Sequence, residues 1–290
     1  MKFGIHYSQA LGLDPTVDDY IEVAQFIESL GFSSLWLGDH IVIPKTIEAS
    51  YPYTSDGSIG FHPATPWPDP FIMLTAIAMA TRSLRLATGI TVLPYRNPIQ
   101  VAKSVATLDQ IARGRFLFGV GVGWLAEEYA ALNVPFEDRG ARANEYLEII
   151  IAMWKDKIAD FKGRYYTIPD LHINPQPYQK PHPPIIVGGQ SGRAFKRIVA
   201  FGDGWQSGPV SLALFREELA QLGADMERAG RKIEDLRLFK VVTPDFLLDN
   251  LHEISAHEQL GVEEMVLLLN CDSRQEAEAQ IRRAASILLR

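Results

Sequence analysis

Residues 184–207, PIIVGGQSGRAFKRIVAFGDGWQS, contain one complete strand–helix–strand unit. The apolar run at 184–187 predicts a buried strand, residues 193–200 predict a helix, and 204–207 predict the next strand. Two strands joined through a helix run parallel, and their crossover is right-handed. This stretch therefore predicts an α/β fold built on a parallel sheet.

The same alternation extends through the rest of the chain. Helical patterns with start and stop signals lie between the strands, for example from Thr16 to Gly31 and from Asn97 to Gly114. Eight strand–helix units in 290 residues predict a (β/α)8 barrel, which carries its reactive side chains at the carboxyl ends of the strands. The predicted strands cover residues 3–7, 34–37, 84–92, 116–120, 184–187, 204–207, 236–242 and 265–269.

Two long connections interrupt the barrel pattern, one after strand two (44–70) and one before strand five (about 160–183). Loops of this length inside a compact domain are usually functional or disordered. The second contains FKGRYYTI at 161–168, which predicts a small hairpin. Because no linker with a shift in composition divides the chain, we expect one domain over residues 1–290, an α/β barrel with these two insertions.

The charge balance argues against one class of function. With 28 Lys plus Arg against 35 Asp plus Glu, the net charge is −7, so we expect no nucleic-acid partner. In and just before a helix predicted at 144–154, Arg139, Arg142 and Glu145 are expected to form i,i+3 pairs on a solvated face.

The sequence also predicts a compartment. The single cysteine, Cys271, cannot form an internal disulfide, and its apolar setting predicts a packed thiol. The N-terminus lacks the pattern of a secretory leader, and no apolar run reaches the roughly 18 residues of a membrane span. We therefore expect a cytoplasmic protein that binds no membrane.

Two strand ends carry candidate site residues. Asp39 and His40 follow the strand 34–37, where an imidazole could exchange a proton near neutral pH beside a carboxylate that binds a ligand. The alternative is that Asp39 caps a turn and His40 is a wall residue. At the end of strand three, Gly89 and Thr91 leave room for a flat ligand, or else serve a tight barrel interior.

A glycine-rich turn follows strand four. Gly121, Gly123 and Ala126 match the relaxed dinucleotide fingerprint G-x-G-x-x-A, but a helix continues where that fold requires a second strand. A turn that presents backbone N–H groups to an anionic or flat ligand fits this stretch better.

A second glycine-rich turn, residues 188–192, leads from strand five into a helix. Glycines with a hydroxyl at a helix N-terminus favour an anion cradle, and a turn that merely needs positive φ angles is the alternative. Ser191 does not lie in G-x-S-x-G, so it is not a nucleophile elbow. The histidines show no metal-ligand spacing, and we expect no metal site.

Taken together, these segments resemble the luciferase-like monooxygenase superfamily, in particular its short branch that uses the deazaflavin coenzyme F420. The resemblance spans nearly the whole chain and implies a (β/α)8 barrel that holds a flat tricyclic ring at the carboxyl ends of its strands. The segments that carry it are LWLGDHIVIP (35–44), TGITVLPYRNP (88–98), VAKSVATLDQIARGRFLFGVGVGW (101–124) and PPIIVGGQSGRAFKRIVAFGDGW (183–205).

The resemblance implies a role for each motif. His40 would be the catalytic residue, as a proton donor or hydrogen-bonding group, with Asp39 beside the ring. Thr91 and Val92 would form a bulge behind the ring, often with a non-proline cis peptide. The remaining implied cofactor contacts are Val122 and Gly123 along the ring or its side chain, and Gly188, Gly189, Ser191 and Gly192 around a phosphate.

The sequence departs from the family pattern at one position. Members that oxidise sugar phosphates with coenzyme F420 carry a Glu after the glycine that Gly123 matches, and here that residue is Trp124. Sugar-phosphate oxidation is therefore not expected, and neither Glu127 nor Glu128 is assumed to replace that Glu. The insertion 44–70 would overlie the site with aromatic side chains that either select an apolar or aromatic substrate or anchor the loop: Tyr51, Tyr53, Phe61, His62 and Trp67.

These observations favour a coenzyme F420-dependent oxidoreductase that moves a hydride to or from a small organic substrate. The resemblance also implies a homodimer. A two-component monooxygenase that uses reduced FMN and oxygen is the main alternative, since a phosphate cradle serves either cofactor. Alternatives from other classes are a redox-inactive barrel that hydrolyses or isomerises a phosphorylated metabolite, and a binding module without activity.

Overall fold

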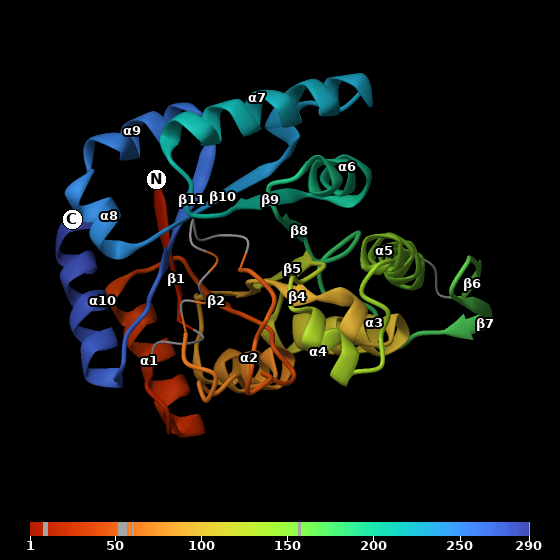
Figure 1. Ribbon diagram of the computed structural model, residues 1–290, viewed down its shortest axis with the longest axis horizontal. Helices are drawn as coiled ribbons and strands as arrows, with labels where there is room; N and C mark the ends of the chain where they lie inside the picture. The colour runs from red at the N-terminus through yellow and green to blue at the C-terminus, as the bar shows by residue number, and fades with distance from the viewer. Residues whose placement is uncertain (8–10, 52–56, 58, 60, 156–157, 290) are drawn as a thin grey trace.

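Eight parallel strands close into a barrel surrounded by helices, as the sequence predicts (Figure 1). The computed structural model describes residues 1–7, 11–51, 57, 59, 61–155 and 158–289. The strands follow each other in the order β3-β2-β1-β11-β10-β9-β8-β5, and pairing of β3 with β5 closes the ring. The barrel strands are β1 (Lys2–His6), β2 (Ser34–Leu37), β3 (Arg85–Thr88), β5 (Phe116–Gly121), β8 (Ile185–Gly188), β9 (Gly204–Ser207), β10 (Arg237–Val242) and β11 (Val262–Leu268).

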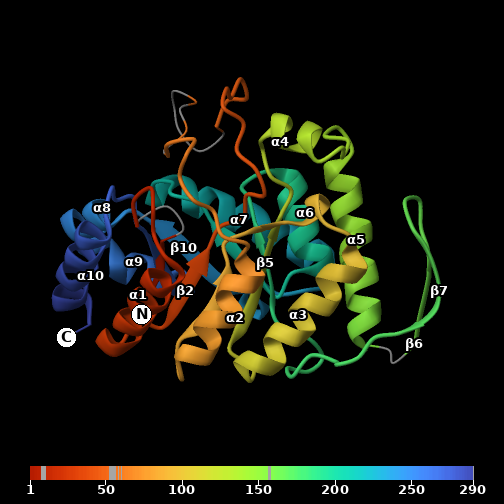
Figure 2. The ribbon, with the colours of Figure 1, turned by 90° about the horizontal axis from the view of Figure 1, so that it is seen from below.

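Helices cover the outer face of the barrel (Figures 1 and 2). The predicted start signals are confirmed, because Thr16 forms a capping box with Asp19 and the side chain of Asn97 accepts hydrogen bonds from the first turn of its helix. The helices are α1 (Val17–Leu30), α2 (Pro70–Ala80), α3 (Pro98–Ala112), α4 (Ala126–Ala131), α5 (Arg139–Lys155), α6 (Gly192–Phe201), α7 (Leu212–Arg228), α8 (Pro244–Asp249), α9 (His252–Gln259) and α10 (Arg274–Leu288), with the 3-10 turns η1 (Leu93–Tyr95) and η2 (Ile233–Asp235).

The third predicted strand, 84–92, is not continuous. It divides into β3 and β4 (Thr91–Val92), and the peptide bond between them, Gly89–Ile90, is cis. While β3 pairs with β2 and β5, β4 pairs with β5 alone. The expectation of one strand was wrong here, because hydropathy does not report the isomer of a peptide bond.

Side chains fill the barrel interior toward the amino ends of the strands. Trp36 and Phe239 meet edge to face at 5.0 Å, within a cluster that also contains Ile186 and Val266. Below this cluster the fully buried Glu264 accepts hydrogen bonds from Ser34 and Arg85. This end is packed shut, so a ligand reaches the barrel from the carboxyl ends of the strands.

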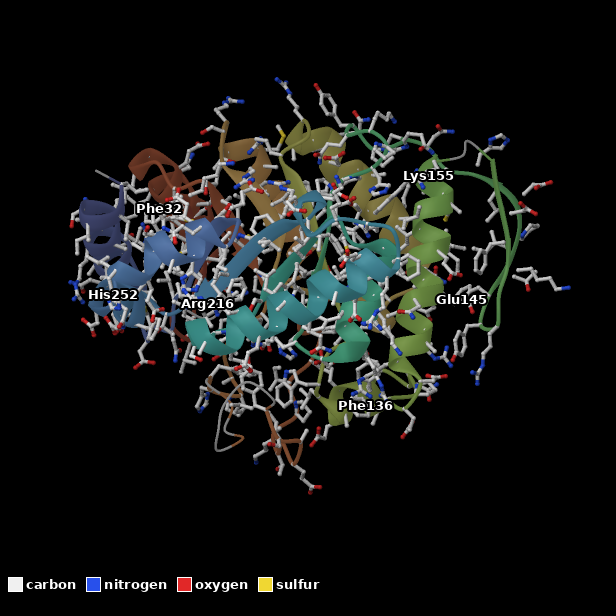
Figure 3. The ribbon with its side chains drawn as sticks, turned by 90° about the horizontal axis from the view of Figure 1, so that it is seen from above. Phe32, Phe136, Glu145, Lys155, Arg216 and His252 are labelled. Atoms are coloured by element: carbon white, nitrogen blue, oxygen red, sulfur yellow. The ribbon has the colours of Figure 1, made fainter. Side chains whose placement is uncertain are left out.

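The insertion before strand five forms the expected hairpin, β6 (Ile158–Lys162) and β7 (Thr167–His172), which stands beside α5 (Figure 1). Glu145 on α5 faces this hairpin (Figure 3), and its carboxylate accepts the backbone N–H groups of Arg164, Tyr165 and Tyr166 at 2.7 to 3.1 Å. The expectation that Glu145 lies on a solvated face was wrong, because the side chain caps the hairpin turn and is buried. Arg142 pairs instead with Asp138 at 2.8 Å.

Two further properties follow from the described residues. Cys271 is buried, as predicted for a packed thiol, and burial raises its pKa to about 12. Among the helices that the structure describes, none is both long and apolar enough to cross a membrane.

Candidate active site

Asp39, two residues after the end of β2, connects several segments at the mouth of the barrel. Its buried carboxylate accepts the backbone N–H of Val92 at 2.9 Å and the guanidinium of Arg96 at 2.5 and 2.8 Å. Arg96 also reaches Asp69, the N-cap of α2, at 3.0 Å. Burial raises the pKa of Asp39, and the positive charge of Arg96 opposes that shift. The carboxylate thus fixes β4 and the start of α2 to the end of β2.

His40 is held by a carboxylate that lies far away in the sequence. Its Nδ1 donates to Oε2 of Glu128 at 2.7 Å, and the side chain of Glu128 is fully buried. The same carboxylate accepts the backbone N–H groups of Ile41 and Val42 at 2.6 and 3.1 Å and the hydroxyl of Tyr95 at 2.9 Å. Since a carboxylate can only accept at this contact, Nδ1 carries a proton, and the orientation of the imidazole is fixed.

Glu128 is the site residue that sequence reasoning missed. It lies in the first turn of α4, the short helix that follows β5, so position in the fold places it near the mouth. The local sequence gives no sign that Glu128 pairs with His40, since the two residues are 88 positions apart. A pair of acidic residues opening a helix after a barrel strand was the available signal.

Aromatic rings from the long insertion surround His40. The ring of Trp67 meets His40 edge-on at 4.8 Å, and Phe61 lies 5.7 Å from His40 and 5.2 Å from Trp67. Trp124 approaches His40 at 6.4 Å and Tyr51 at 5.1 Å. Tyr53, also predicted for this wall, lies outside the described residues, and His62 is exposed.

A recess of about 150 Å³ opens beside His40, and Trp67 lines it. The indole Nε1 of Trp67 is buried and has no hydrogen-bond partner within the described part of the chain. Apart from His40 and Trp67, the recess is lined by Ile41, Val42, Ile43, Pro63 and Thr65.

A neighbouring carboxylate fastens the insertion itself. Glu127 Oε1 accepts the backbone N–H groups of Glu48 and Ala49 at 2.6 and 2.9 Å. The insertion rises at the same end of the barrel as α4 (Figure 2). Consecutive acidic residues of α4 therefore hold consecutive parts of the chain after β2, with Glu128 on residues 40–42 and Glu127 on residues 48–49.

The chain between β3 and β4 places Ile90 inside the mouth. A Cβ at Gly121 would lie 1.7 Å from the Ile90 side chain, and one at Gly188 would lie 3.0 Å from it. These two positions must stay small to admit the isoleucine. Thr91, next in the chain, is fully buried.

Val122 and Gly123 form the turn that leaves β5. Gly123 has a φ of +63°, and a Cβ there would approach Val92 within 2.8 Å. The Val122 carbonyl accepts the hydroxyl of Tyr129 at 2.6 Å. The turn therefore packs against β4, which brings the predicted residues Val92, Val122 and Gly123 together.

The turn from β8 into α6 has the form of the predicted cradle. Gly189 adopts a φ of +118° that side chains rarely tolerate, and its carbonyl accepts the indole N–H of Trp205 at 2.9 Å. Ser191 is the N-cap of α6, and its hydroxyl accepts the N–H of Ala194. A Cβ at Gly192 would meet nothing within 4 Å, so the space before the helix N-terminus is open.

The mouth offers features that a flat ring with a phosphate would use. Three buried polar atoms near strand ends, His6 Nδ1, Thr91 Oγ1 and Gln206 Nε2, have no hydrogen-bond partner within the described structure. A buried polar group without a partner is costly, and a bound ligand can supply that partner. With the open N-terminus of α6, these groups fit a flavin-type cofactor.

A metal centre finds no support in the described residues. No group of three or more His, Cys, Asp and Glu side chains among them could hold a metal ion.

Comparisons with known proteins agree with this architecture. The profile of the luciferase-like monooxygenase family matches residues 1–244. An uncharacterized protein of Mycobacterium tuberculosis is 31% identical over 248 residues, which covers 86% of this chain and 84% of that protein. The oxygenase component of the flavin-dependent trigonelline monooxygenase of Acinetobacter baylyi is 29% identical over 222 residues, 76% of this chain and 55% of that one.

Solved structures share the fold at low identity. The monooxygenase RslO1 from Streptomyces bottropensis superposes with a TM-score of 0.79 at 20% identity, covering 100% of this chain and 99% of that one. The coenzyme F420-dependent tetrahydromethanopterin reductase from Methanopyrus kandleri gives a TM-score of 0.74 at 16% identity, covering 99% and 98%.

Proposed function

The chain belongs to the luciferase-like monooxygenase family, and from that premise we propose that it is a coenzyme F420-dependent oxidoreductase. In this proposal a hydride moves between the deazaflavin and a small organic substrate. Because the chain belongs to an oxidoreductase family, the two alternatives from other classes are not favoured. These are a redox-inactive hydrolase or isomerase and a binding module without activity.

The pairing of His40 with Glu128 carries the proposal. An imidazole at the carboxyl end of a barrel strand is fixed at Nδ1 by a fully buried carboxylate and lines the recess beside it in one orientation. Such a group exchanges a proton with a substrate oxygen or nitrogen as the redox step proceeds. His40 is therefore the proposed catalytic residue, and Glu128 is the residue that positions it.

The cofactor contacts are proposed as follows. Thr91, Val92 and the Ile90 side chain would support one face of the ring, and Val122 and Gly123 would border its side chain. Asp39 would act through Val92 and Arg96, since both its oxygens already accept protein donors. When bound, the deazaflavin supplies the hydride chemistry. The phosphate would lie among Gly188, Gly189, Ser191 and Gly192 at the open N-terminus of α6.

The wall beside His40 favours an apolar or aromatic substrate. Phe61, Trp67 and Trp124 surround the imidazole, and Trp124 stands where a carboxylate would be needed for sugar phosphates. Aromatic faces and edges bind flat apolar groups better than hydroxyl-rich ones.

A second cofactor has specific support. One relative is named as a flavin-dependent monooxygenase, and the structure with a TM-score of 0.79 is also named as a monooxygenase. The same cradle accommodates the phosphate of FMN, so reduced FMN with oxygen is the alternative proposal.

Parallel fluorescence titrations with coenzyme F420 and with FMN decide between them. Tighter binding of coenzyme F420 than of FMN is the expected result, and hydride-acceptor screening would follow. Preference for FMN would replace the deazaflavin proposal with the monooxygenase. Binding of neither would overturn both proposals.

Assembly and location complete the proposal. We propose a homodimer in the cytoplasm, in line with the family resemblance and the single unpaired cysteine.

A further inference from the structure

A lysine is buried outside the barrel, behind the phosphate cradle. Lys240 lies in β10 with 1% of its surface exposed, facing the helix layer formed by α7 and α9. Its Nζ donates to the carbonyl oxygen of Gly208, just past the end of β9, and lies 5.6 Å from the ring centre of Phe215 on α7. A buried ammonium group is costly unless it serves a purpose or has compensating charges.

Titratable groups from two helices face this lysine. Glu218 on α7 and Glu253 on α9 both act on it through their charges. His257 on α9 packs against Phe215 at 5.5 Å, and burial lowers the pKa of its imidazole. The positive charge of Arg216 on α7 also lowers the pKa of His257. Since the two carboxylates are the neighbours that favour its charged form, Lys240 is the cation of an acidic, enclosed cluster.

One of these carboxylates is connected to the cradle. Gln190, in the middle of the turn from β8 into α6, donates from Nε2 to the two carboxylate oxygens of Glu218 at 3.2 and 3.3 Å. Gly208, which accepts from Lys240, follows the adjacent strand β9. The loops after β8 and β9 are thus fastened by groups of one buried charge cluster.

We propose that Lys240 and Glu218 are positioning residues for the cofactor phosphate, acting on the cradle from behind through charge and through Gln190. The inference rests on the proposed function, which puts a phosphate at residues 188–192. Lys240 favours an anion there, while Glu218 opposes it and holds the turn in place. The two residues therefore have opposite electrostatic effects on phosphate affinity.

The proposal includes a dependence on pH. Burial lowers the pKa of Lys240 to about 8, so the lysine carries its charge below that pH and loses it above. The stabilisation of a bound phosphate is then present at pH 7 and lost as the pH rises through 8. The imidazole of His257, whose pKa is lowered, is neutral across this interval.

The test compares a ligand that has a phosphate with one that lacks it. Dissociation constants of FMN and of riboflavin are measured by fluorescence for the wild type, Lys240→Met, Glu218→Gln and the double variant. We expect Lys240→Met to weaken FMN binding about tenfold, the order expected for one buried unit charge near a phosphate. Riboflavin binding should stay unchanged.

The variant Glu218→Gln separates an electrostatic role of Glu218 from a merely structural one, because only the electrostatic role predicts tighter FMN binding. The glutamine still accepts a hydrogen bond from Gln190 but has no charge. At a pH low enough to keep Lys240 protonated without the carboxylate that raises its pKa, FMN binding should therefore tighten while riboflavin binding stays the same. The double variant should return close to the wild type. Loss of FMN affinity in both single variants would overturn the electrostatic assignment.

Titration with pH supplies an independent readout. The FMN dissociation constant of the wild type should rise between pH 7 and 9, and that of Lys240→Met should stay flat. If Lys240→Met does not fold, the pH dependence of FMN binding by the wild type and the FMN affinity of Glu218→Gln still test the proposal. A wild type that binds neither flavin, coenzyme F420 nor its phosphate-free deazaflavin would refute the proposed function. A wild type that binds FMN with a flat pH profile and with no response to Glu218→Gln would refute this inference alone.

Discussion

His40 is a single side chain whose chemistry depends on one neighbour. Because Nδ1 of His40 is hydrogen-bonded to Glu128, the imidazole has a fixed ring orientation. We expect His40→Ala to leave cofactor affinity within about twofold and to lower kcat by about 100-fold or more, the contribution of a positioned acid–base group. Cofactor titration and steady-state kinetics measure the two quantities. An unchanged kcat would remove His40 from the reaction.

Glu128 and Glu127 form a matched pair for mutagenesis. In Glu128→Gln, the new amide NH2 meets the donors of His40 and Tyr95, so a buried donor is left without an acceptor. We expect the free energy of unfolding to fall by about 2 kcal/mol. In Glu127→Gln the amide replaces an oxygen that has no partner in the described structure, so the loss should stay below about 1 kcal/mol. Urea denaturation of both variants tests the difference.

At the residue scale the sequence supports His40 and leaves Glu128 unmarked. A histidine directly after a predicted strand can be assigned to the barrel mouth without coordinates. Its partner joins it only through tertiary structure, because α4 folds back over residues 40–42. The roles of the predicted site residues stay predictions until they are tested.

Among the elements, the turn from β8 into α6 allows a sharp comparison of two glycines. Gly189 has a φ of +118° and a Cβ there would lie 3.0 Å from Ala194, whereas a Cβ at Gly192 would meet nothing. We expect Gly189→Ala to destabilise the protein by about 1–2 kcal/mol and to weaken FMN binding more than riboflavin binding. Gly192→Ala should stay within about 0.5 kcal/mol of the wild type. Equal losses in both variants would contradict the strain argument.

The elements themselves could largely be predicted. Apolar runs and helix caps located the barrel strands and the ends of helices such as α1 and α3, because period and capping are local properties. The division of the third strand into β3 and β4 does not follow from hydropathy, and only the family resemblance, which implies a bulge at Thr91 and Val92, pointed to a break in this strand. Glu145 was misjudged because its partners are backbone groups of a hairpin turn that only the folded chain brings to α5.

The whole molecule presents one helix that is unusual for a barrel surface. The helix α2, PFIMLTAIAMA, contains no charged residue. Although the helix is apolar on every face, part of it is open to solvent, because the side chains of Ile72 and Met79 are 75% and 67% exposed. An apolar surface of this kind is typical of a protein–protein interface. We expect Met79→Glu to convert the proposed homodimer into a monomer, as measured by light scattering after gel filtration. The control Gln221→Glu adds the same charge at an exposed position of α7, away from α2, and the mass should then stay that of the dimer. A wild-type monomer would refute the dimer proposal.

The fastening of the long insertion at both ends has an evolutionary consequence. Glu128 holds residues 40–42 just before it and Glu127 holds Glu48 and Ala49 near its start, while Asp69 caps α2 and pairs with Arg96 at its end. The sequence between Ala49 and Asp69 can therefore vary without loss of the contacts at its two ends, because those contacts are made by residues of the barrel domain outside this stretch. If the proposed site is correct, we expect libraries that vary residues 50–68 other than Phe61 and Trp67 to change substrate choice while the proposed catalytic imidazole and phosphate site keep their positions.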